Sequence, residues 1–367
     1  MDGRRAVLFA LTAALCAVLL VDSACPACTA FSLEGKRTVL SAKNYDWEVE
    51  AGQVVVNPRG LQKRAAASEN PAVWTSRFGS VTFNQYGREF PCGGVNENGL
   101  VIEVLWLEET VYPADDARPA VSPLQWLQYL LDNCASVEEA LAAQEKIRIP
   151  AGTSVPLHFF LCDESGSCAA VEFLEGETVV HTGKDLPTRV LTNHTYDVSR
   201  RFLMEHAGFG GSRLPAEGFR SKDRFVRTSA ALAERKAAGG PSVDEAFAIL
   251  DGVASEQTMW SIVYDLGGKR LYFRTHSFGA IREVDMNVFD FSCSAPALVL
   301  DMSDSLSGPV NGSFVTYTTE ANRELIREAY GATDFLQSID EETLESLARY
   351  PEAFPCADSP RPTSGLQ

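Results

Sequence analysis

The fold is decided by one stretch, SACPACTAFSLEGKRTVLSAKNYDW at residues 23–47, in which a small-residue segment leads into two strand-like runs. Upstream of it, Arg4 and Arg5 precede an apolar run of about 16 residues, which is short for a membrane span of about 20. A basic start, an apolar middle and a small-residue end are typical of a secretory signal peptide. We therefore expect residues 1–27 to be removed on export to the periplasm or the medium, which leaves Cys28 as the mature N-terminus.

Cys28 opens a predicted β-hairpin. Two alternating runs, at 28–31 and 38–41, flank a short turn that contains glycine. Such a hairpin brings Lys43 and Asp46 back beside Cys28. An N-terminal cysteine combines a thiol nucleophile and an α-amine base in one residue. The alternative is a cysteine that simply follows the leader and has no chemical role.

Further motifs follow in order along the chain. The set is Cys28-Thr29, Lys43-Asn44-Tyr45-Asp46, Gly94-Val95-Asn96-Glu97-Asn98-Gly99-Leu100, Ser136-Val137-Glu138-Glu139-Ala140, Leu191-Thr192-Asn193 and Asp223-Arg224-Phe225-Val226-Arg227. Together they resemble the choloylglycine hydrolase family, which contains bile salt hydrolases and penicillin V acylases, over residues 28–300. Each motif is weak alone, and their shared order makes the resemblance specific. Lys43 departs from the family, which usually has arginine at this position.

The resemblance implies an α+β fold, the four-layer α-β-β-α sandwich of N-terminal-nucleophile hydrolases. The chain's own pattern agrees, because strand-like runs are grouped and helix-like segments lie between the groups. The predicted strands are 79–83, 100–107, 157–162, 169–173, 189–192, 259–264 and 270–274, and the predicted helices are 123–133, 222–236, 243–253 and 320–330, with a capping box at 136–139. We expect a single hydrolase domain over 28–356 and a disordered tail over 357–367.

The resemblance and the chemistry together assign roles to five residues. Cys28 is the expected nucleophile and its own α-amine the base, because a reference pKa of about 7.7–8.0 lies close to working pH. Asp46 would orient that amine, and Asn193 would form the oxyanion hole. Arg224 and Lys43 would place positive charge near the thiol and favour its thiolate form.

Other interpretations of these residues stay open. Asp46 also fits a turn residue, and Arg224 fits a solvated helix face. Asn193 begins Asn193-His194-Thr195, which is formally a glycosylation sequence. Lys43 cannot reproduce the bidentate fork of an arginine.

Two tryptophans indicate the class of substrate. Trp47 follows Asp46, and Trp106 stands where bile salt hydrolases usually have asparagine, so the chain resembles the penicillin V acylase branch more closely. Two tryptophans near the nucleophile would form a flat apolar slot for a phenoxyacetyl or fatty acyl group, although two core tryptophans are the alternative. We expect hydrolysis of penicillin V or an N-acyl homoserine lactone, with conjugated bile salts as the alternative substrates.

Composition limits the partners and indicates disulfides. The chain has 367 residues and is 45% hydrophobic, which is enough for one large core. Its formal net charge of −17 argues against nucleic acid or an anionic membrane surface as a partner.

Cys16 and Cys25 precede the cleavage site, and six cysteines remain beside Cys28, an even number that indicates disulfides in an exported protein. Cys162 and Cys168 flank a predicted hairpin turn, which favours a bond between them over two free thiols.

Other function classes are weaker. None of the five histidines lies in a papain-like protease motif. No histidine or cysteine pair has metal-ligand spacing, so neither a metal nor another cofactor is expected. A lipid-anchored binding protein would begin at Cys25, but Asp22 stands where lipoprotein signals have leucine.

The expected partner is a small N-acyl amide, with no stable membrane association. A homo-oligomer is compatible with the resemblance. The short interval between Asn193 and Arg224 leaves little room for the long loop that stabilises bile salt hydrolase tetramers, so we expect a weaker or different assembly.

Overall fold

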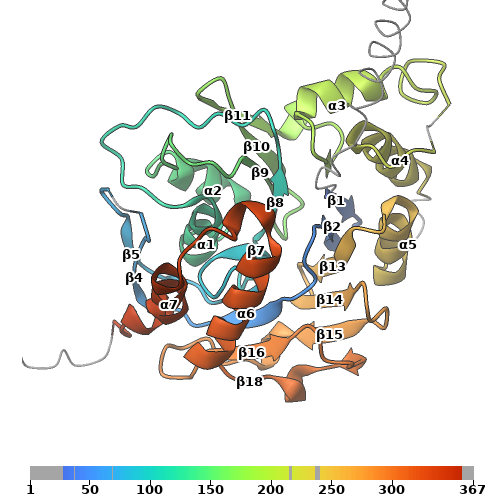
Figure 1. Ribbon diagram of the computed structural model, residues 1–367. Helices are drawn as coiled ribbons and strands as arrows, with labels where there is room; N and C mark the ends of the chain where they lie inside the picture. The colour runs from blue at the N-terminus through green and yellow to red at the C-terminus, as the bar shows by residue number, and fades with distance from the viewer. Residues whose placement is uncertain (1–27, 37, 68, 215–216, 236–239, 358–367) are drawn as a thin grey trace, which may run out of the picture.

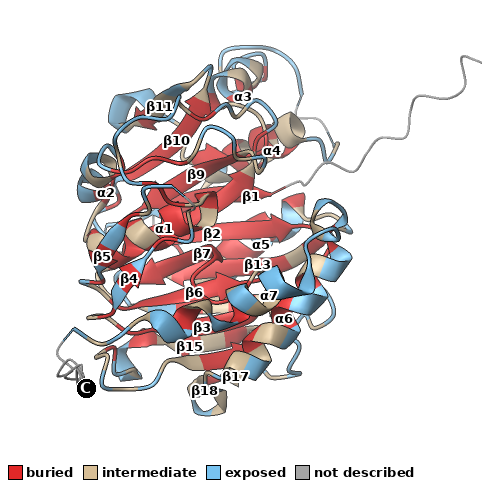
Figure 2. Cartoon of the chain, turned by 60° about the vertical axis from the view of Figure 1, so that its left-hand side comes forward, coloured by how far each residue is buried: buried red, intermediate tan, exposed pale blue. Residues whose placement is uncertain are grey.

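The computed structural model describes residues 28–36, 38–67, 69–214, 217–235 and 240–357 (Figure 1). The expected leader and all of the expected tail after residue 357 lie outside these described residues. Buried strands fill the centre of the molecule, and helices and loops with exposed faces surround them (Figure 2).

A seven-stranded sheet carries the predicted hairpin. Its strand order is β12-β1-β2-β13-β14-β15-β17. In that order, the strands are Val190–Leu191, Thr29–Glu34, Val39–Asp46, Thr258–Asp265, Arg270–Thr275, Arg282–Asp285 and Gly308–Pro309. β1 and β2 pair antiparallel, with Thr29 opposite Asn44, and β13 pairs with the other edge of β2. Every residue of β2 is buried, because this strand is central in its sheet and is covered on both faces.

A nine-stranded sheet forms the second layer. Its order is β11-β10-β9-β8-β7-β6-β3-β16-β18. In that order, the strands are Glu177–Thr182, Cys168–Leu174, Leu157–Cys162, Val101–Trp106, Pro91–Asn96, Ser80–Asn84, Gln53–Asn57, Leu298–Asp301 and Val315–Thr316. A separate hairpin joins β4 (Gln62–Arg64) and β5 (Val73–Thr75).

The two sheets pack face to face. Phe83 on β6 packs edge-on against Tyr264 on β13 and Phe273 on β14, with ring centroids 6.1 and 5.5 Å apart. Because successive strand residues point to opposite faces, one set of side chains from each sheet fills the space between the layers. The ion pair of Lys43 with Glu103, described below, lies in this same space.

Helices cover the outer faces. On one side α4 (Ser221–Glu234) packs on β1, and α5 (Val243–Val253) packs on β2 and β13. On the other side α1 (Pro123–Asn133) packs on β7 and β8, with α2 (Val137–Gln144) beside it. The remaining helices are α3 (Tyr196–Leu203), α6 (Thr319–Ala332) and α7 (Glu341–Arg349), with short 3-10 turns η1 (Gly183–Asp185), η2 (Met286–Val288), η3 (Asn311–Ser313), η4 (Asp334–Leu336) and η5 (Tyr350–Ala353). The predicted four-layer α-β-β-α sandwich is confirmed.

Two disulfides form among the described cysteines. The predicted bond between Cys162 and Cys168 is present and joins the facing ends of β9 and β10. A second bond joins Cys293 to Cys356. Cys92 and Cys134 are buried free thiols, so the even number of cysteines does not mean that all of them pair.

Candidate active site

Cys28 lies at the start of β1, one residue before the pair that Thr29 makes with Asn44. This register places its thiol beside the end of β2, where Sγ lies 3.7 Å from the backbone oxygen of Asp46. Burial raises the pKa of the Cys28 thiol to about 11, although the positive charges of Lys43 and Arg224 act in the opposite direction. The thiol therefore needs a nearby base before it can act as a nucleophile at neutral pH.

The Asp46 carboxylate is buried, and the described residues do not meet its need for hydrogen-bond donors. Neither of its side-chain oxygens has a hydrogen-bond partner within the described part of the chain. Burial raises the pKa of Asp46 to about 6, against the lowering effects of Arg224, Thr258 and Lys43. A buried carboxylate without a donor is costly, so this geometry calls for a cationic or N–H donor at this point.

Arg224 on α4 connects the start of the chain to the candidate oxyanion residue. Its Nη1 donates to the Cys28 backbone oxygen and to Thr29 Oγ1, each at 2.5 Å. Its Nη2 donates to Asn193 Oδ1 at 2.9 Å. The side chain is fully buried, so it is not the solvated helix residue that the sequence also allowed. Its planar fork instead fixes Cys28 and Asn193 relative to each other.

Asn193 lies two residues after the end of β12 and is almost fully buried. Its Nδ2 donates to the Trp106 backbone oxygen at 2.9 Å, while Arg224 holds its Oδ1. The orientation of the amide is therefore set by both of its ends. A side-chain amide has two N–H donors, and the Trp106 carbonyl uses one of them.

Lys43 crosses the space between the two sheets. Its Nζ lies 2.8 Å from Glu103 Oε2 on β8 and donates to the Cys92 backbone oxygen at 2.8 Å. Tyr264 donates to the other carboxylate oxygen of Glu103 at 2.5 Å. Burial raises the pKa of Glu103, and the charge of Lys43 opposes that shift.

The structure brings Cys28, Asp46, Asn193 and Arg224 into one cluster, and it places Lys43 close enough to lower the pKa of the Cys28 thiol. Sequence reasoning missed Glu103. A charged residue in the middle of the apolar run Val101–Trp106 was the available signal, because such a residue is buried only when it is paired.

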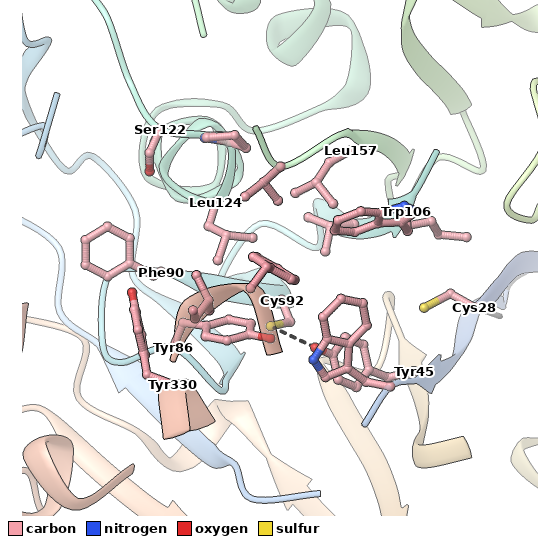
Figure 3. A pocket seen from close by; sticks show the side chains of 17 residues that line it. Cys28, Tyr45, Tyr86, Phe90, Cys92, Trp106, Ser122, Leu124, Leu157 and Tyr330 are labelled. Atoms are coloured by element: carbon pink, nitrogen blue, oxygen red, sulfur yellow. Dashed lines mark hydrogen bonds between the residues drawn. The ribbon is translucent and has the colours of Figure 1, made fainter. Parts of the chain in front are cut away.

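An apolar cavity of about 230 Å³ opens beside the Cys28 thiol (Figure 3). Trp47 and Trp106 line this cavity together with Cys28, and their ring centroids lie 5.7 Å apart. From there the cavity runs past aromatic and aliphatic side chains, including those of Tyr45, Tyr86, Phe90, Leu124, Leu157, Tyr330 and Phe335. Trp47 and Trp106 are thus both packed residues and cavity walls. The contribution of Tyr330 and Phe335 was not predicted from the sequence.

Among the described residues there is neither a metal-site cluster nor a helix that could span a membrane. Within the ranges given above, no cluster of three or more His, Cys, Asp or Glu side chains has the arrangement of a metal site. Over those same ranges, no helix combines the length and apolarity needed to cross a bilayer.

Comparisons with known proteins agree with this geometry. The sequence model of the choloylglycine hydrolase family of linear amide C–N hydrolases matches residues 28–299. A curated penicillin V acylase from Pectobacterium atrosepticum is 31% identical over 207 residues, which cover 52% of this chain and 54% of that protein. The match thus spans about half the length of that relative.

Solved structures extend the comparison. The penicillin V acylase from Agrobacterium tumefaciens is 30% identical with a TM-score of 0.71, and the match covers 79% of this chain and 98% of that one. A mutant conjugated bile acid hydrolase from Clostridium perfringens is 20% identical with a TM-score of 0.62, and the match covers 77% of this chain and 99% of that one. At that identity the second likeness concerns the fold alone.

Proposed function

The chain belongs to the choloylglycine hydrolase family of linear amide C–N hydrolases, and on that premise we propose that it is an exported cysteine N-terminal-nucleophile amidase. Its substrate is a small N-acyl amide, with penicillin V or an N-acyl homoserine lactone favoured. The observation that carries this proposal is the Cys28 thiol at one end of an apolar cavity, beside a buried Asp46 carboxylate whose oxygens have no hydrogen-bond donor placed on them by the described residues. The free α-amine of a mature Cys28 would supply that donor.

In the acylation step, the α-amine of Cys28 takes the thiol proton, and the thiolate attacks the carbonyl carbon of the amide. The new C–S bond turns the carbonyl oxygen into an oxyanion, which the second N–H of Asn193 can meet. The α-ammonium then gives its proton to the amide nitrogen. The C–N bond breaks, the amine leaves, and the acyl group remains on Cys28 as a thioester.

Deacylation uses the same groups with water in place of the thiol. The α-amine takes a proton from water, and the hydroxide formed attacks the thioester carbonyl. The C–S bond breaks, the acid is released, and the thiol regains the proton. Arg224 contributes by holding Asn193 and the Cys28 backbone still, so that the oxyanion site is organised before the reaction begins.

The cavity supports a slim acyl group. An engineered apolar cavity of about 150 Å³ is known to bind benzene, and the cavity beside Cys28 is roughly one and a half times as large. It therefore fits one aromatic ring with a short linker, as in a phenoxyacetyl group, or a medium-length alkyl chain. Four fused steroid rings would extend beyond this volume toward the open side of the pocket, so the smaller acyl groups fill it more completely.

Side-by-side kinetics test this proposal. The purified exported protein is assayed on penicillin V, on N-acyl homoserine lactones and on glycine- and taurine-conjugated bile salts. We expect kcat/KM to be highest for one of the first two classes. A higher value for bile salts would move the chain to the bile salt branch of the family, and no hydrolysis of any amide would overturn the proposal.

The intact mass of the exported protein tests the start of the mechanism. We expect a mature chain that begins at Cys28. A lipid-modified chain that begins at Cys25 would indicate an anchored binding protein instead. The nitrogen of Cys28 would then be part of the peptide bond to Ala27 and could not act as a base.

A further inference from the structure

We propose that residues 319–336, which form α6 and η4, determine which acyl groups the enzyme accepts. This inference rests on the proposed function and adds to it a set of residues that select the substrate. The segment lies beyond residue 299, where the match to the family's sequence model ends. It nevertheless supplies three side chains to the cavity: Tyr330, Phe335 and Leu336.

The segment closes the cavity at the end far from the nucleophile. Figure 3 shows Cys28 on one side of the pocket and Phe90, Tyr86 and Tyr330 on the other. The Tyr330 ring packs edge-on against Tyr86, with centroids 5.8 Å apart. The Tyr86 hydroxyl also lies 3.4 Å from Thr333 Oγ1, which joins this end of the cavity to the end of α6.

The same segment reaches the slot near the nucleophile. The ring of Phe335 lies 5.9 Å from that of Trp106, centroid to centroid, although Phe335 is 48% exposed. A phenylalanine that is half exposed and also lines a pocket stands at its rim. One short piece of chain thus meets an acyl group both where it enters and where it ends.

The wall is firmly held against the loop between β6 and β7. Asn322 Oδ1 accepts from the backbone N–H of Arg88 at 2.8 Å. Ile326 packs on Gly87, where an added Cβ would lie only 2.7 Å from Ile326 Cδ1 and where φ is +96°. The Cys293–Cys356 bond ties down the chain that follows α7. A wall held in this way can set a fixed limit on the length of the acyl group.

The expected signature is a limit on chain length. While an added methylene still fits the cavity, it should raise kcat/KM about fourfold, because burying one methylene contributes about 0.8 kcal/mol. Once the chain end meets Tyr330, further methylenes should give no increase or a decrease.

Variants at Tyr330 test this limit on N-acyl homoserine lactones whose linear chains are lengthened by two carbons at a time. Tyr330→Ala should move the optimum to longer chains by at least one step of the series, and Tyr330→Trp should move it to shorter ones. Tyr330→Leu, which removes the ring but keeps an apolar side chain, is measured in parallel in case the alanine variant folds poorly. Glu328→Ala, on the exposed face of the same helix, is the matched control and should leave the profile unchanged.

The outcomes separate this inference from the function on which it rests. If the wild type hydrolyses neither these lactones nor penicillin V nor conjugated bile salts, the proposed function is wrong. If it acts on phenoxyacetyl amides alone, the same variants are compared on phenoxyalkanoyl amides of increasing linker length. If the wild type is active and folded Tyr330 variants keep its length profile, the function stands and this inference falls. A shift in opposite directions for the smaller and the larger side chain supports it.

Discussion

Lys43 and Glu103 form an ion pair that joins the two sheets, with Nζ and Oε2 2.8 Å apart and both side chains almost completely buried. One of the two cations that act on the Cys28 thiol is thus held by the opposite sheet. Because a lysine has a single point charge where an arginine has a fork, this partner also fixes where that charge lies.

Removing one member of this pair should destabilise the protein strongly. Glu103→Gln leaves the Lys43 charge buried without a counter-ion, so we expect the free energy of unfolding to fall by about 3–5 kcal/mol. The double variant Lys43→Met, Glu103→Gln should recover much of that loss. Urea unfolding of the wild type, Lys43→Met, Glu103→Gln and the double variant measures the coupling free energy between the two residues. Additive effects of the two single substitutions would show that the pair is not energetically linked.

Cys28→Ala should abolish amide hydrolysis, because no other group in the cluster can form the thioester. Cys134→Ala is a matched control, since Cys134 is also a buried free thiol but does not line the cavity. The control should keep most of its activity. Both proteins are checked by circular dichroism, and more than a few per cent of wild-type kcat/KM in a well-folded Cys28→Ala protein would rule out the mechanism.

Asn193→Ala should lower kcat by about 10²–10³ with little change in KM, because an oxyanion donor acts mainly on the transition state. Steady-state kinetics on the best substrate gives both constants. An increase in KM at constant kcat would assign Asn193 to substrate binding instead.

Trp106→Ala should mainly raise KM, because the acyl group is held in similar fashion before and during the reaction. Loss of part of the slot beside Trp47 removes apolar contact worth about 25 cal/mol per Å². Kinetics on a phenoxyacetyl amide and on its acetyl counterpart test this, since only the larger acyl group should be affected. Equal effects on both would point to disturbance of Asn193, which donates to the Trp106 backbone oxygen.

Asp46 should make stability depend on whether Cys28 has a free amine. Its folded pKa of about 6 lies above the ordinary value of 3.8, so the neutral acid is favoured in the fold. In a form that keeps Ala27 attached, the free energy of unfolding should be highest below pH 3.8, where Asp46 is protonated in both the folded and the unfolded state. It should fall by up to about 3 kcal/mol as the pH rises through 6, because the buried carboxyl must then ionise.

Denaturant unfolding at pH 4.5 and pH 7.5 tests this link. At pH 7.5, Asp46→Asn should stabilise the form that keeps Ala27, because it removes a buried unpaired charge. The same substitution should destabilise the mature form, where the free amine of Cys28 donates an N–H to the carboxylate. Equal effects on the two forms would show that Asp46 does not contact that amine.

Local signals carried most of the sequence-based prediction of the fold. The helices Pro123–Asn133 and Val243–Val253 have the predicted bounds, because serine caps and apolar spacing mark their ends. The strand Leu157–Cys162 also matches, since all of its residues except His158 are apolar. The hairpin of β1 and β2 follows from alternation and a turn, and this hairpin places Asp46 beside Cys28.

Features that depend on distant contacts were not predictable in the same way. Helix α7 (Glu341–Arg349) was missed because its sequence is mostly polar and only Ala348 is buried. The pairing of Glu103 with Lys43 required knowledge of how the two sheets face each other. The position of Tyr330 against Tyr86 likewise depends on where α6 docks, which no local pattern encodes.

The cavity is lined by residues as far apart in sequence as Cys28 and Leu336. A ribosome makes the nucleophile first and the selecting wall close to last, so a nascent chain has no complete acyl site until residue 336 has been added. During biosynthesis, the catalytic groups near Cys28 are therefore made long before the wall that limits the length of the acyl group. A chain cut short before α6 would lack that wall even if its catalytic cluster formed.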